Sequence, residues 1–285
     1  MEKQKEKTKF EKLLKTFAAT LDSYVSSKDR QWTIKGFIDV YKNIYTISTD
    51  TKIVSKILEI HLFPELVKFA SQNNYYIVLT DHQNYYPDLT FVSKKDESLK
   101  FAVDLKTTYR LAGHPDFCNG FTLGSHGSYF KERDKRKNIQ FPYNHYSGHF
   151  CLGAIYTRAE PDSIDETKVH NVETLKSITS VIKDIQFFIC EKWKIASDSQ
   201  GSGNTANIGS IVSISDILKG NGVFKKLGES WFDDYWMNYN EITIIKDDKQ
   251  KKITKLRDFL EFRGADPDLA NPINRVRARR NKKDE

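Results

Sequence analysis

The pattern of apolar and polar positions predicts helices in the first part of the chain. In the segment 10–25 apolar residues recur three and four positions apart, starting with Phe10, Leu13, Leu14 and Phe17. This spacing puts them on one face and predicts an amphipathic helix. The face would pack either on the protein's own core or against a second subunit, and the pattern leaves both open.

A second helix is predicted from about Thr51 to Ile60. Asp50 precedes it and is a suitable N-cap, because its carboxylate can accept the free amide groups of the first turn. The apolar positions of this segment lie on one side, and Glu59 falls on the polar side. Pro64 is expected to open a separate helical stretch, since proline is favoured at the first position of a helix.

After residue 74 the pattern changes to short apolar runs that predict β-strands. These runs lie at 75–80, 89–93, 99–107, 150–156, within 181–194, and at 208–214. Further helices are expected around 131–146 and at 253–262. The mixture predicts an α/β (α+β) fold, a mixed central sheet flanked by helices. We expect a single domain over residues 1–264 that includes an N-terminal dimerisation helix, followed by a basic tail over 265–285.

Composition excludes several classes of protein. Of the 285 residues 39% are hydrophobic and 13% aromatic, too many for a disordered chain. No apolar run reaches the roughly 20 residues that span a bilayer, and the charged start lacks the apolar core of a signal peptide. Cys118, Cys151 and Cys190 lie far apart, which favours reduced thiols over a zinc site. A cytoplasmic protein is therefore expected.

The charge is modestly basic and unevenly distributed. The formal net charge is +7, and the last fifteen residues hold six basic and two acidic residues, or +4. About half of the excess therefore lies in the tail. A basic excess of this size is compatible with nucleic-acid binding but does not by itself establish it.

The candidate catalytic residues are two aspartates and a lysine. Asp88 follows Tyr86-Pro87 at the start of one predicted strand, and Asp104 and Lys106 lie two apart on the next. Residues i and i+2 share one face of a strand, so a hairpin would bring both carboxylates to one point. Two carboxylates with open positions suit Mg²⁺, and a lysine beside the metal could orient water and stabilise phosphate charge. The alternative is a solvated hairpin with a salt bridge.

The position of Asp104 favours the nuclease interpretation. It interrupts an otherwise apolar strand, where a carboxylate costs free energy unless a cation or hydrogen bonds compensate. Glu59 could supply a third carboxylate, although a surface glutamate is the simpler interpretation from sequence. His145 and His149 lie four apart and could bind a metal, but without a third ligand a packing role is favoured.

The segment 201–210 is rich in Gly, Ser, Asn and Thr. It lacks the Gly-Lys-Ser/Thr of a phosphate-binding loop, which excludes an ATPase of that kind. Asn can pair with adenine in the major groove, and Thr can contact the thymine methyl group. A flexible hairpin loop is the alternative. The aromatic residues of 231–236 are expected to be core, because duplex DNA leaves no bases free to stack.

Six short motifs, in this order, resemble those of the EcoRV family of type II restriction endonucleases. They are TKIVS at 51–55, NYYPDLT at 84–90, VDLKTTY at 103–109, FTLG at 121–124, IYTR at 155–158 and GSGNTANIGSI at 201–211. The likeness runs from about residue 45 to 264. It implies the PD-(D/E)xK nuclease fold and a homodimer around double-stranded DNA. It also implies Mg²⁺ as cofactor, which Mn²⁺ can replace, and a cognate DNA methyltransferase in a prokaryotic host.

The resemblance assigns roles residue by residue. Asp88, Asp104 and Glu59 match the metal-binding and catalytic carboxylates, and Lys106 matches the catalytic lysine. The residues that match DNA-contacting positions are Lys52, His82, Gln83, Asn84, Thr122, Ser128, Lys137, Gly201, Ser202, Gly203, Asn204, Thr205 and Ala206. Within this set Asn204 and Thr205 match the residues that read bases.

This chain departs from the family pattern at several positions. His82 stands where a glutamine is expected, and Ala206 replaces a threonine, which removes one possible phosphate contact. Because Asn204 and Thr205 are retained, the expected target is the palindrome GATATC, cut bluntly at its centre to leave 5′-phosphate and 3′-hydroxyl ends. The alternatives are a structure-selective nuclease such as a junction resolvase, and a non-catalytic DNA-binding protein.

Overall fold

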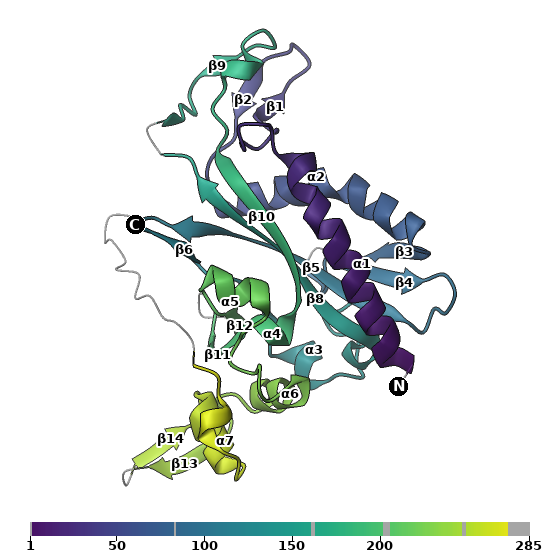
Figure 1. Cartoon of the computed structure of the whole chain (residues 1–285), viewed down its shortest axis with the longest axis vertical. Helices are drawn as coiled ribbons and strands as arrows, with labels where there is room; N and C mark the ends of the chain where they lie inside the picture. Colours follow the sequence, from purple (N-terminus) through teal and green to yellow (C-terminus); the bar gives the residue numbers. More distant parts are fainter. Residues whose placement is uncertain (1, 83, 161–162, 202–205, 247–248, 273–285) are drawn as a thin grey trace. The chain divides into compact units, whose positions relative to one another are not determined.

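The computed structural model describes residues 2–82, 84–160, 163–201, 206–246 and 249–272. The chain forms two compact units, each built from two segments (Figure 1). Unit 1 contains residues 1–110 and 145–189, and unit 2 contains residues 111–144 and 190–285. The expected tail is described only as far as residue 272, so the division at residue 264 stays a prediction.

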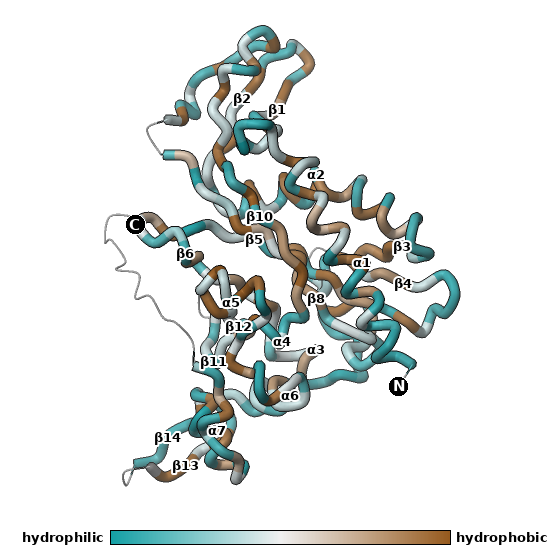
Figure 2. The backbone as a smooth tube through the Cα atoms, in the orientation of Figure 1, coloured by the Kyte–Doolittle hydropathy of each residue, from teal (hydrophilic) through white to brown (hydrophobic). Residues whose placement is uncertain are grey.

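The main sheet of unit 1 has the strand order β10-β8-β5-β4-β3. β3, β4 and β5 pair antiparallel, whereas β5 and β8 pair parallel, so the sheet is mixed as predicted. Figure 2 shows hydrophobic residues along its central strands. The strands are β3 (Tyr75–Leu79), β4 (Leu89–Ser93), β5 (Lys100–Leu111), β8 (Tyr146–Arg158) and β10 (Ile182–Glu191).

Helix α1 (Glu2–Val25) packs on this sheet through the predicted apolar stripe. Phe10 is fully buried, and its ring stacks on Phe101 of β5 with the centroids 4.2 Å apart. It also lies against Phe91 of β4 and Phe150 of β8. Burial of one phenylalanine is worth about 2 kcal/mol. The stripe therefore belongs to the core of its own unit, and a dimer contact through this helix stays a prediction.

Helix α2 (Thr51–Gln72) is longer than predicted. Asp50 caps it as expected, because its carboxylate accepts hydrogen bonds from the backbone amides of Lys52 and Ile53. The prediction of a separate helix from Pro64 was wrong, because Pro64 lies inside one continuous helix. Proline removes the hydrogen bond to the carbonyl of Ile60. Ile60 is 63% exposed, so water can satisfy that carbonyl while the buried side chains on either side of Pro64 hold the helix on the core.

A small antiparallel sheet, ordered β1-β2-β9, completes unit 1. It consists of β1 (Gly36–Ile38), β2 (Ile44–Thr46) and β9 (Val169–His170). Several of its apolar side chains are exposed, and in the turn between β1 and β2 Val40 is 90% and Tyr41 82% exposed. Such a concentration of exposed apolar side chains is typical of an interaction surface.

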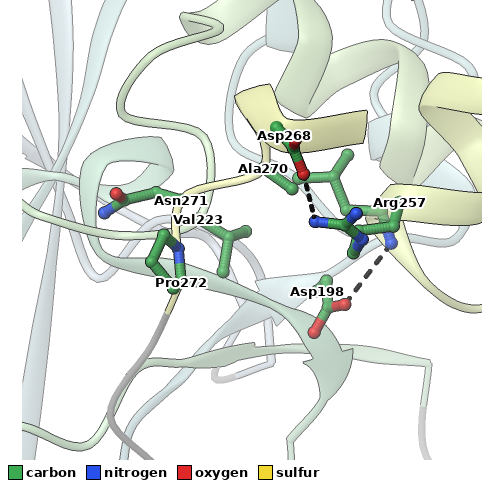
Figure 3. A pocket seen from close by; sticks show the side chains of 8 residues that line it. Asp198, Val223, Arg257, Asp268, Ala270, Asn271 and Pro272 are labelled. Atoms are coloured by element: carbon green, nitrogen blue, oxygen red, sulfur yellow. Dashed lines mark hydrogen bonds and ion pairs between the residues drawn. The ribbon is translucent and has the colours of Figure 1, made fainter. Parts of the chain in front are cut away.

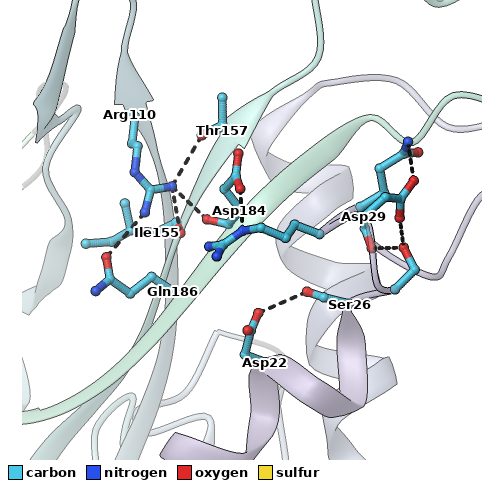
Figure 4. A network of polar contacts seen from close by, with 11 residues as sticks. Asp22, Ser26, Asp29, Arg110, Ile155, Thr157, Asp184 and Gln186 are labelled. Carbon is cyan, nitrogen blue, oxygen red and sulfur yellow. Dashed lines mark hydrogen bonds and ion pairs between the residues drawn. The ribbon is translucent and has the colours of Figure 1, made fainter.

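A half-buried arginine, Arg110, ties together strands of unit 1 (Figure 4). The Arg110 guanidinium donates to the carbonyls of Ile155 and Asp184 and to the side chain of Gln186. Arg30 pairs with the Asp184 carboxylate at 2.6 Å. The contacts of Arg110 satisfy the backbone carbonyls of Ile155 and Asp184. Asp184 has a positive φ of 52°, which departs from regular strand geometry.

Unit 2 contains a three-stranded antiparallel sheet ordered β11-β12-β7. Gly209 on β12 is required there, because a Cβ would lie 2.6 Å from the Ser199 carbonyl oxygen. The strands are β6 (His114–Cys118), β7 (Thr122–Ser125), β11 (Ala196–Gln200), β12 (Asn207–Ser210), β13 (Thr243–Lys246) and β14 (Lys249–Lys252). The helices are α3 (Ser128–Lys131), α4 (Lys192–Ile195), α5 (Ile214–Lys219), α6 (Glu229–Met237) and α7 (Leu256–Phe262).

The helix predicted around 131–146 was wrong. Only α3 and a 3₁₀ turn, Tyr143–His145, are helical in this stretch. The charged run after Lys131 has no apolar stripe to bury, and its cations pair either within the run, as Lys135 does with Glu132, or with other elements of unit 2. Arg133, for example, contacts Asp233 at 2.7 Å. Asn138 has a positive φ of 60°, which is incompatible with a continuing helix.

Three of the four aromatic residues of α6 are core, as predicted, whereas Trp231 is half-buried. Phe232, Tyr235 and Trp236 are 1% exposed or less. His149 is also buried, in unit 1, with its Nδ1 2.9 Å from the hydroxyl oxygen of Tyr86, which agrees with a packing role for this residue, whereas His145 is exposed. Of the helices in the described part of the chain, none combines the length and apolar character needed to cross a bilayer.

Candidate active site and DNA-binding loop

The alternation of side chains along β5 separates the core from the candidate site. Phe101, Val103 and Leu105 point to the hydrophobic core under the helices. Asp104 and Lys106 lie on the opposite face of the strand. Asp104 is 7% exposed, so its carboxylate has left bulk water and needs compensating partners.

Asp88 and Asp104 are joined through reciprocal backbone contacts. β4 and β5 pair with Leu89 opposite Val103, which places the residue before β4 beside Asp104. The Asp88 amide donates to Asp104 Oδ1 at 3.2 Å, and the Leu105 amide donates to Asp88 Oδ2 at 2.8 Å. The two carboxylates therefore converge because each accepts a hydrogen bond from the other's strand.

Lys106 supplies the positive charge that faces both carboxylates. Its Nζ lies 2.9 Å from Asp104 Oδ2 and 3.6 Å from Asp88 Oδ2. Burial alone lowers the pKa of Lys106, but the two carboxylates raise it further than burial lowers it. The lysine is thus an ammonium group in the metal-free protein. It can donate hydrogen bonds and stabilise negative charge, whereas it holds its proton too firmly to serve there as a base.

Asp88 has the opposite electrostatic character. Burial raises its pKa to about 6, with Asp104 and Glu59 adding to the rise and Lys106 opposing it. A raised carboxylate pKa means that the negative charge is destabilised in the folded, metal-free protein. A divalent cation would relieve this destabilisation, because it supplies the positive charge that the pair of aspartates lacks.

This raised pKa predicts that the metal-free protein is stabilised by the change Asp88→Asn at neutral pH. The carboxyl of Asp88 favours folding below its unfolded pKa near 3.8, and this contribution is lost as pH rises through about 6. Asn mimics the neutral form at every pH. Because 34% of the side chain is exposed, we expect a gain of only about 1 kcal/mol at pH 7.5.

The free energy of unfolding, measured in EDTA at pH 7.5 and 4.5, checks this prediction. The gain from Asp88→Asn should be largest at pH 7.5 and clearly smaller at pH 4.5, which lies between the unfolded pKa of 3.8 and the folded pKa of about 6. Asp116→Asn, an exposed aspartate on β6, is the matched control and should change neither value. A destabilised Asp88→Asn variant at pH 7.5 would contradict the assignment.

Glu59 lies on α2 with its carboxylate half-buried. It pairs with Lys56 at 2.9 Å on its own helix, and its charge raises the pKa of Asp88. Within the described residues no three His, Cys, Asp or Glu side chains are grouped closely enough to hold a metal together. Glu59 is thus near enough to act on Asp88 electrostatically, and its role as a metal ligand stays a prediction.

The donor set of Asp88 and Asp104 fits a divalent cation. Both Oδ2 atoms lie within 3.6 Å of the Lys106 Nζ, so they already face one common cation. Carboxylate oxygens are the ligands that Mg²⁺ prefers, and two protein ligands leave positions for water and substrate phosphate. The exposed third of the Asp88 side chain gives access from solvent.

The residues predicted to contact DNA are divided between the units. In unit 1, Lys52 is exposed in the first turn of α2, and His82 and Asn84 are exposed before β4. In unit 2, Thr122 starts β7, Ser128 starts α3 and Lys137 is exposed. Gln83, Ser202, Gly203, Asn204 and Thr205 lie outside the described residues.

The two ends of the predicted recognition loop, residues 201–206, are described. The Gly201 amide donates to the Asn207 carbonyl at 2.9 Å and closes the β11–β12 hairpin. The Cβ that Gly201 lacks would lie 3.2 Å from Thr122 Oγ1, so these two predicted DNA-contacting residues are neighbours. Ala206 is exposed, and its carbonyl accepts the His126 amide at 2.8 Å.

A separate pocket lies in unit 2 beside the C-terminal segment (Figure 3). An ion pair of 2.9 Å between Arg257 and Asp268 lies at its wall, and Asn271 and Pro272 form another side. None of its lining residues was predicted to act in catalysis or DNA binding. The pocket therefore adds nothing to the candidate active site.

Comparison with known proteins identifies the family. The family model described as restriction endonuclease EcoRV matches residues 28–264. The chain is also 34% identical over 238 residues to the type II restriction enzyme EcoRV of Escherichia coli, covering 83% of this chain and 94% of that enzyme. The chain belongs to the EcoRV restriction endonuclease family.

Membership of the EcoRV family settles the class of activity. The protein is a site-specific deoxyribonuclease of type II, and it binds DNA. EcoRV-like nucleases depend on a metal ion, in agreement with the paired carboxylates of Asp88 and Asp104. The mixed sheet flanked by helices agrees with the restriction-endonuclease fold.

Two contributors to the site escaped the sequence analysis. One is the Leu105 backbone amide, which orients Asp88 and which no side-chain pattern could reveal. The other is His126, which contacts the residues at both ends of the loop 201–206. It lies two positions after the FTLG motif, but a single histidine in a strand-to-helix connection carries no signal of its own.

Proposed function

We propose that this EcoRV-family enzyme cleaves both strands of the palindrome GATATC, bluntly at its centre, with Mg²⁺ as its metal. Asn204 and Thr205 support the target, because both are retained in the matched loop. The observation that carries the catalytic part is the convergence of Asp88, Asp104 and Lys106, with Lys106 Nζ within 3.6 Å of both carboxylates. The products would carry 5′-phosphate and 3′-hydroxyl ends.

In this proposal the chain's own residues perform three tasks. Asp88 and Asp104 would hold the cation, and their carboxylates are fixed in place by the Leu105 amide, the Asp88 amide and the β4–β5 pairing. Lys106, as an ammonium group, donates toward the scissile phosphate and stabilises the charge that grows on its oxygens. The bound metal would lower the pKa of the attacking water and neutralise phosphate charge. Mn²⁺, with similar ligand preferences, is expected to replace Mg²⁺.

A homodimer follows from the palindromic target, because a twofold axis places one active site on each strand. We place the contact on the small sheet of unit 1 and its turn rather than on α1. The α1 stripe is buried in its own unit, whereas Phe37, Val40 and Tyr41 are 55%, 90% and 82% exposed. Burying such apolar side chains against a second copy would be favourable, because it removes their surface from water.

Replacing Val40 and Tyr41 together by aspartate is expected to produce a monomer. Sedimentation velocity measures the change directly, and double-strand cleavage should fall with it. Ile245→Asp is the matched control, because Ile245 is 79% exposed but lies on β13 in unit 2. A Val40→Asp/Tyr41→Asp variant that sediments with the wild type would refute this dimer surface.

Digestion of a plasmid with Mg²⁺ tests the proposed function against its alternative. A few discrete, reproducible fragments are expected from a restriction enzyme. A four-way junction should be no better a substrate than a linear duplex containing the site. Preference for the junction, with no discrete plasmid fragments, would instead indicate a resolvase built on the same catalytic residues.

The remaining parts of the proposal concern the cellular setting. A nuclease that cuts a short palindrome would destroy its host's DNA, so we place a methyltransferase of the same specificity beside it in a prokaryotic cytoplasm. The basic residues at 271–285, with a net +4, would add attraction to DNA phosphates that does not depend on sequence.

A further inference from the structure

His126 contacts the residues at both ends of the recognition loop. Its backbone amide donates to the Ala206 carbonyl at 2.8 Å. Its imidazole Nε2 lies 3.2 Å from the side-chain Nε2 of Gln200, the residue immediately before the loop. His126 thus connects Gln200, the last residue of β11, with Ala206, the last residue of the loop.

The imidazole of His126 is held in a rigid aromatic environment. The residue is 6% exposed, and its ring centroid lies 5.2 Å from each of the rings of Trp236 and Tyr239. Trp236 and Tyr239 stack on one another at 4.8 Å, and Trp236 is fully buried. The ring of His126 therefore cannot swing away without disturbing this packing.

The chemistry of the His126–Gln200 contact requires a neutral imidazole. With the Gln200 amide nitrogen facing the ring, that nitrogen donates and Nε2 of His126 accepts. In this arrangement the ring proton is assigned to Nδ1, which is buried and has no hydrogen-bond partner among the described residues. Burial and, to a lesser degree, the nearby Lys131 lower the pKa of His126, while Glu241 acts in the opposite direction. The accepting form is therefore the one present at neutral pH.

We propose that His126 is a positioning residue for sequence recognition, because it fixes Gln200 and Ala206 relative to one another and so sets the base of the loop that reads the DNA. This inference rests on the proposed role of the loop in base recognition. His126 itself is buried and is not assigned a contact with DNA.

Loosening this connection should affect discrimination more than general affinity. Bidentate contacts to bases require accurate placement, whereas phosphate contacts tolerate small shifts because they depend mainly on charge. Loss of one well-placed base contact typically costs about a factor of 10 to 100 in discrimination. The expected signature is a smaller ratio between cleavage of the preferred site and cleavage of sites that differ by one base pair.

Cleavage of GATATC and of its single-base variants by His126 variants tests the proposal. His126→Phe keeps the backbone bond and the aromatic packing but removes the acceptor, and it should lower the ratio of kcat/KM values about tenfold or more. His126→Gln places an amide oxygen near the original Nε2 and should restore most of the ratio. Gln200→Leu should reproduce the effect of His126→Phe, and the double variant should add nothing further.

Two results would overturn the proposal. One is a wild-type ratio in His126→Phe, and the other is an equal loss on all sites that His126→Gln does not rescue, which would indicate a purely structural role. His145→Phe is the matched control, since His145 is exposed in the 3₁₀ turn. Failure of the proposed function is separately visible, because then the wild type would show no site preference or Asn204→Ala would leave the preference intact.

Discussion

The change Asp104→Ala is expected to abolish DNA cleavage while sequence-specific binding survives. Asp104 is the most buried carboxylate of the site, and it contacts both the Asp88 amide and Lys106. Without Asp104 the cation would have only the Asp88 carboxylate of the pair as a ligand. Lys106 would also lose its nearer carboxylate partner. We expect kcat to fall at least about a thousandfold.

A second variant separates loss of chemistry from loss of folding. Asp104→Asn keeps an oxygen that can accept the Asp88 amide but removes the negative charge, so it should fold and still fail to cleave. The control is Asp96→Asn in the β4–β5 turn, where the side chain accepts the Ser98 amide at 2.9 Å and an asparagine can do the same. Gel-shift binding in Ca²⁺ and cleavage in Mg²⁺ give the two readouts. Persistent cleavage by either Asp104 variant would contradict the assignment.

The change Lys106→Met is expected to have two linked effects. Cleavage should fall by about a thousandfold or more, because the ammonium group proposed to stabilise the phosphate charge is lost. The metal-free protein should also be destabilised by about 2 kcal/mol, because two converging carboxylates would keep no cation between them. Added Mg²⁺ should recover much of that stability, since it takes over the role of the missing charge.

Thermal unfolding with and without Mg²⁺ distinguishes this account from a lysine that acts only in catalysis. The rise in Tm on adding Mg²⁺ should be larger for Lys106→Met than for the wild type. Lys100→Ala, on the same strand but outside the site, should show a wild-type rise and keep its cleavage activity. An equal rise in Lys106→Met and the wild type would show that Lys106 does not balance the two aspartates.

Much of the candidate catalytic site was predictable because its geometry depends on local periodicity. The i and i+2 spacing of Asp104 and Lys106 fixes their common face once the strand is recognised, and the apolar run around Asp104 identifies that strand. The position of Asp88 follows from the hairpin between β4 and β5. The apolar stripe of α1 was predictable for the same reason. The main sheet of unit 1, on which it packs, was not, because periodicity shows that a helix face is buried but not which element covers it.

The errors arose where contacts distant in sequence decide the local structure. Pro64 did not start a helix, because buried side chains before and after it hold one helix against the core. The charged run after Lys131 did not form a helix, because its cations find partners such as Asp233, a hundred residues later. His126 gave no signal for a related reason, since its partners Gln200 and Ala206 lie some 70 to 80 residues away.

The sequence at the ends of fragments from one Mg²⁺ digest of genomic DNA tests the central claim most directly. The account predicts blunt fragments that begin with ATC and end with GAT, with 5′-phosphates, and no such fragments from the Asp104→Asn enzyme. Ends with another fixed palindrome would leave the catalytic site in place and overturn the proposed target. Ends without any common sequence, produced equally by the wild type and by Asp104→Asn, would contradict the account.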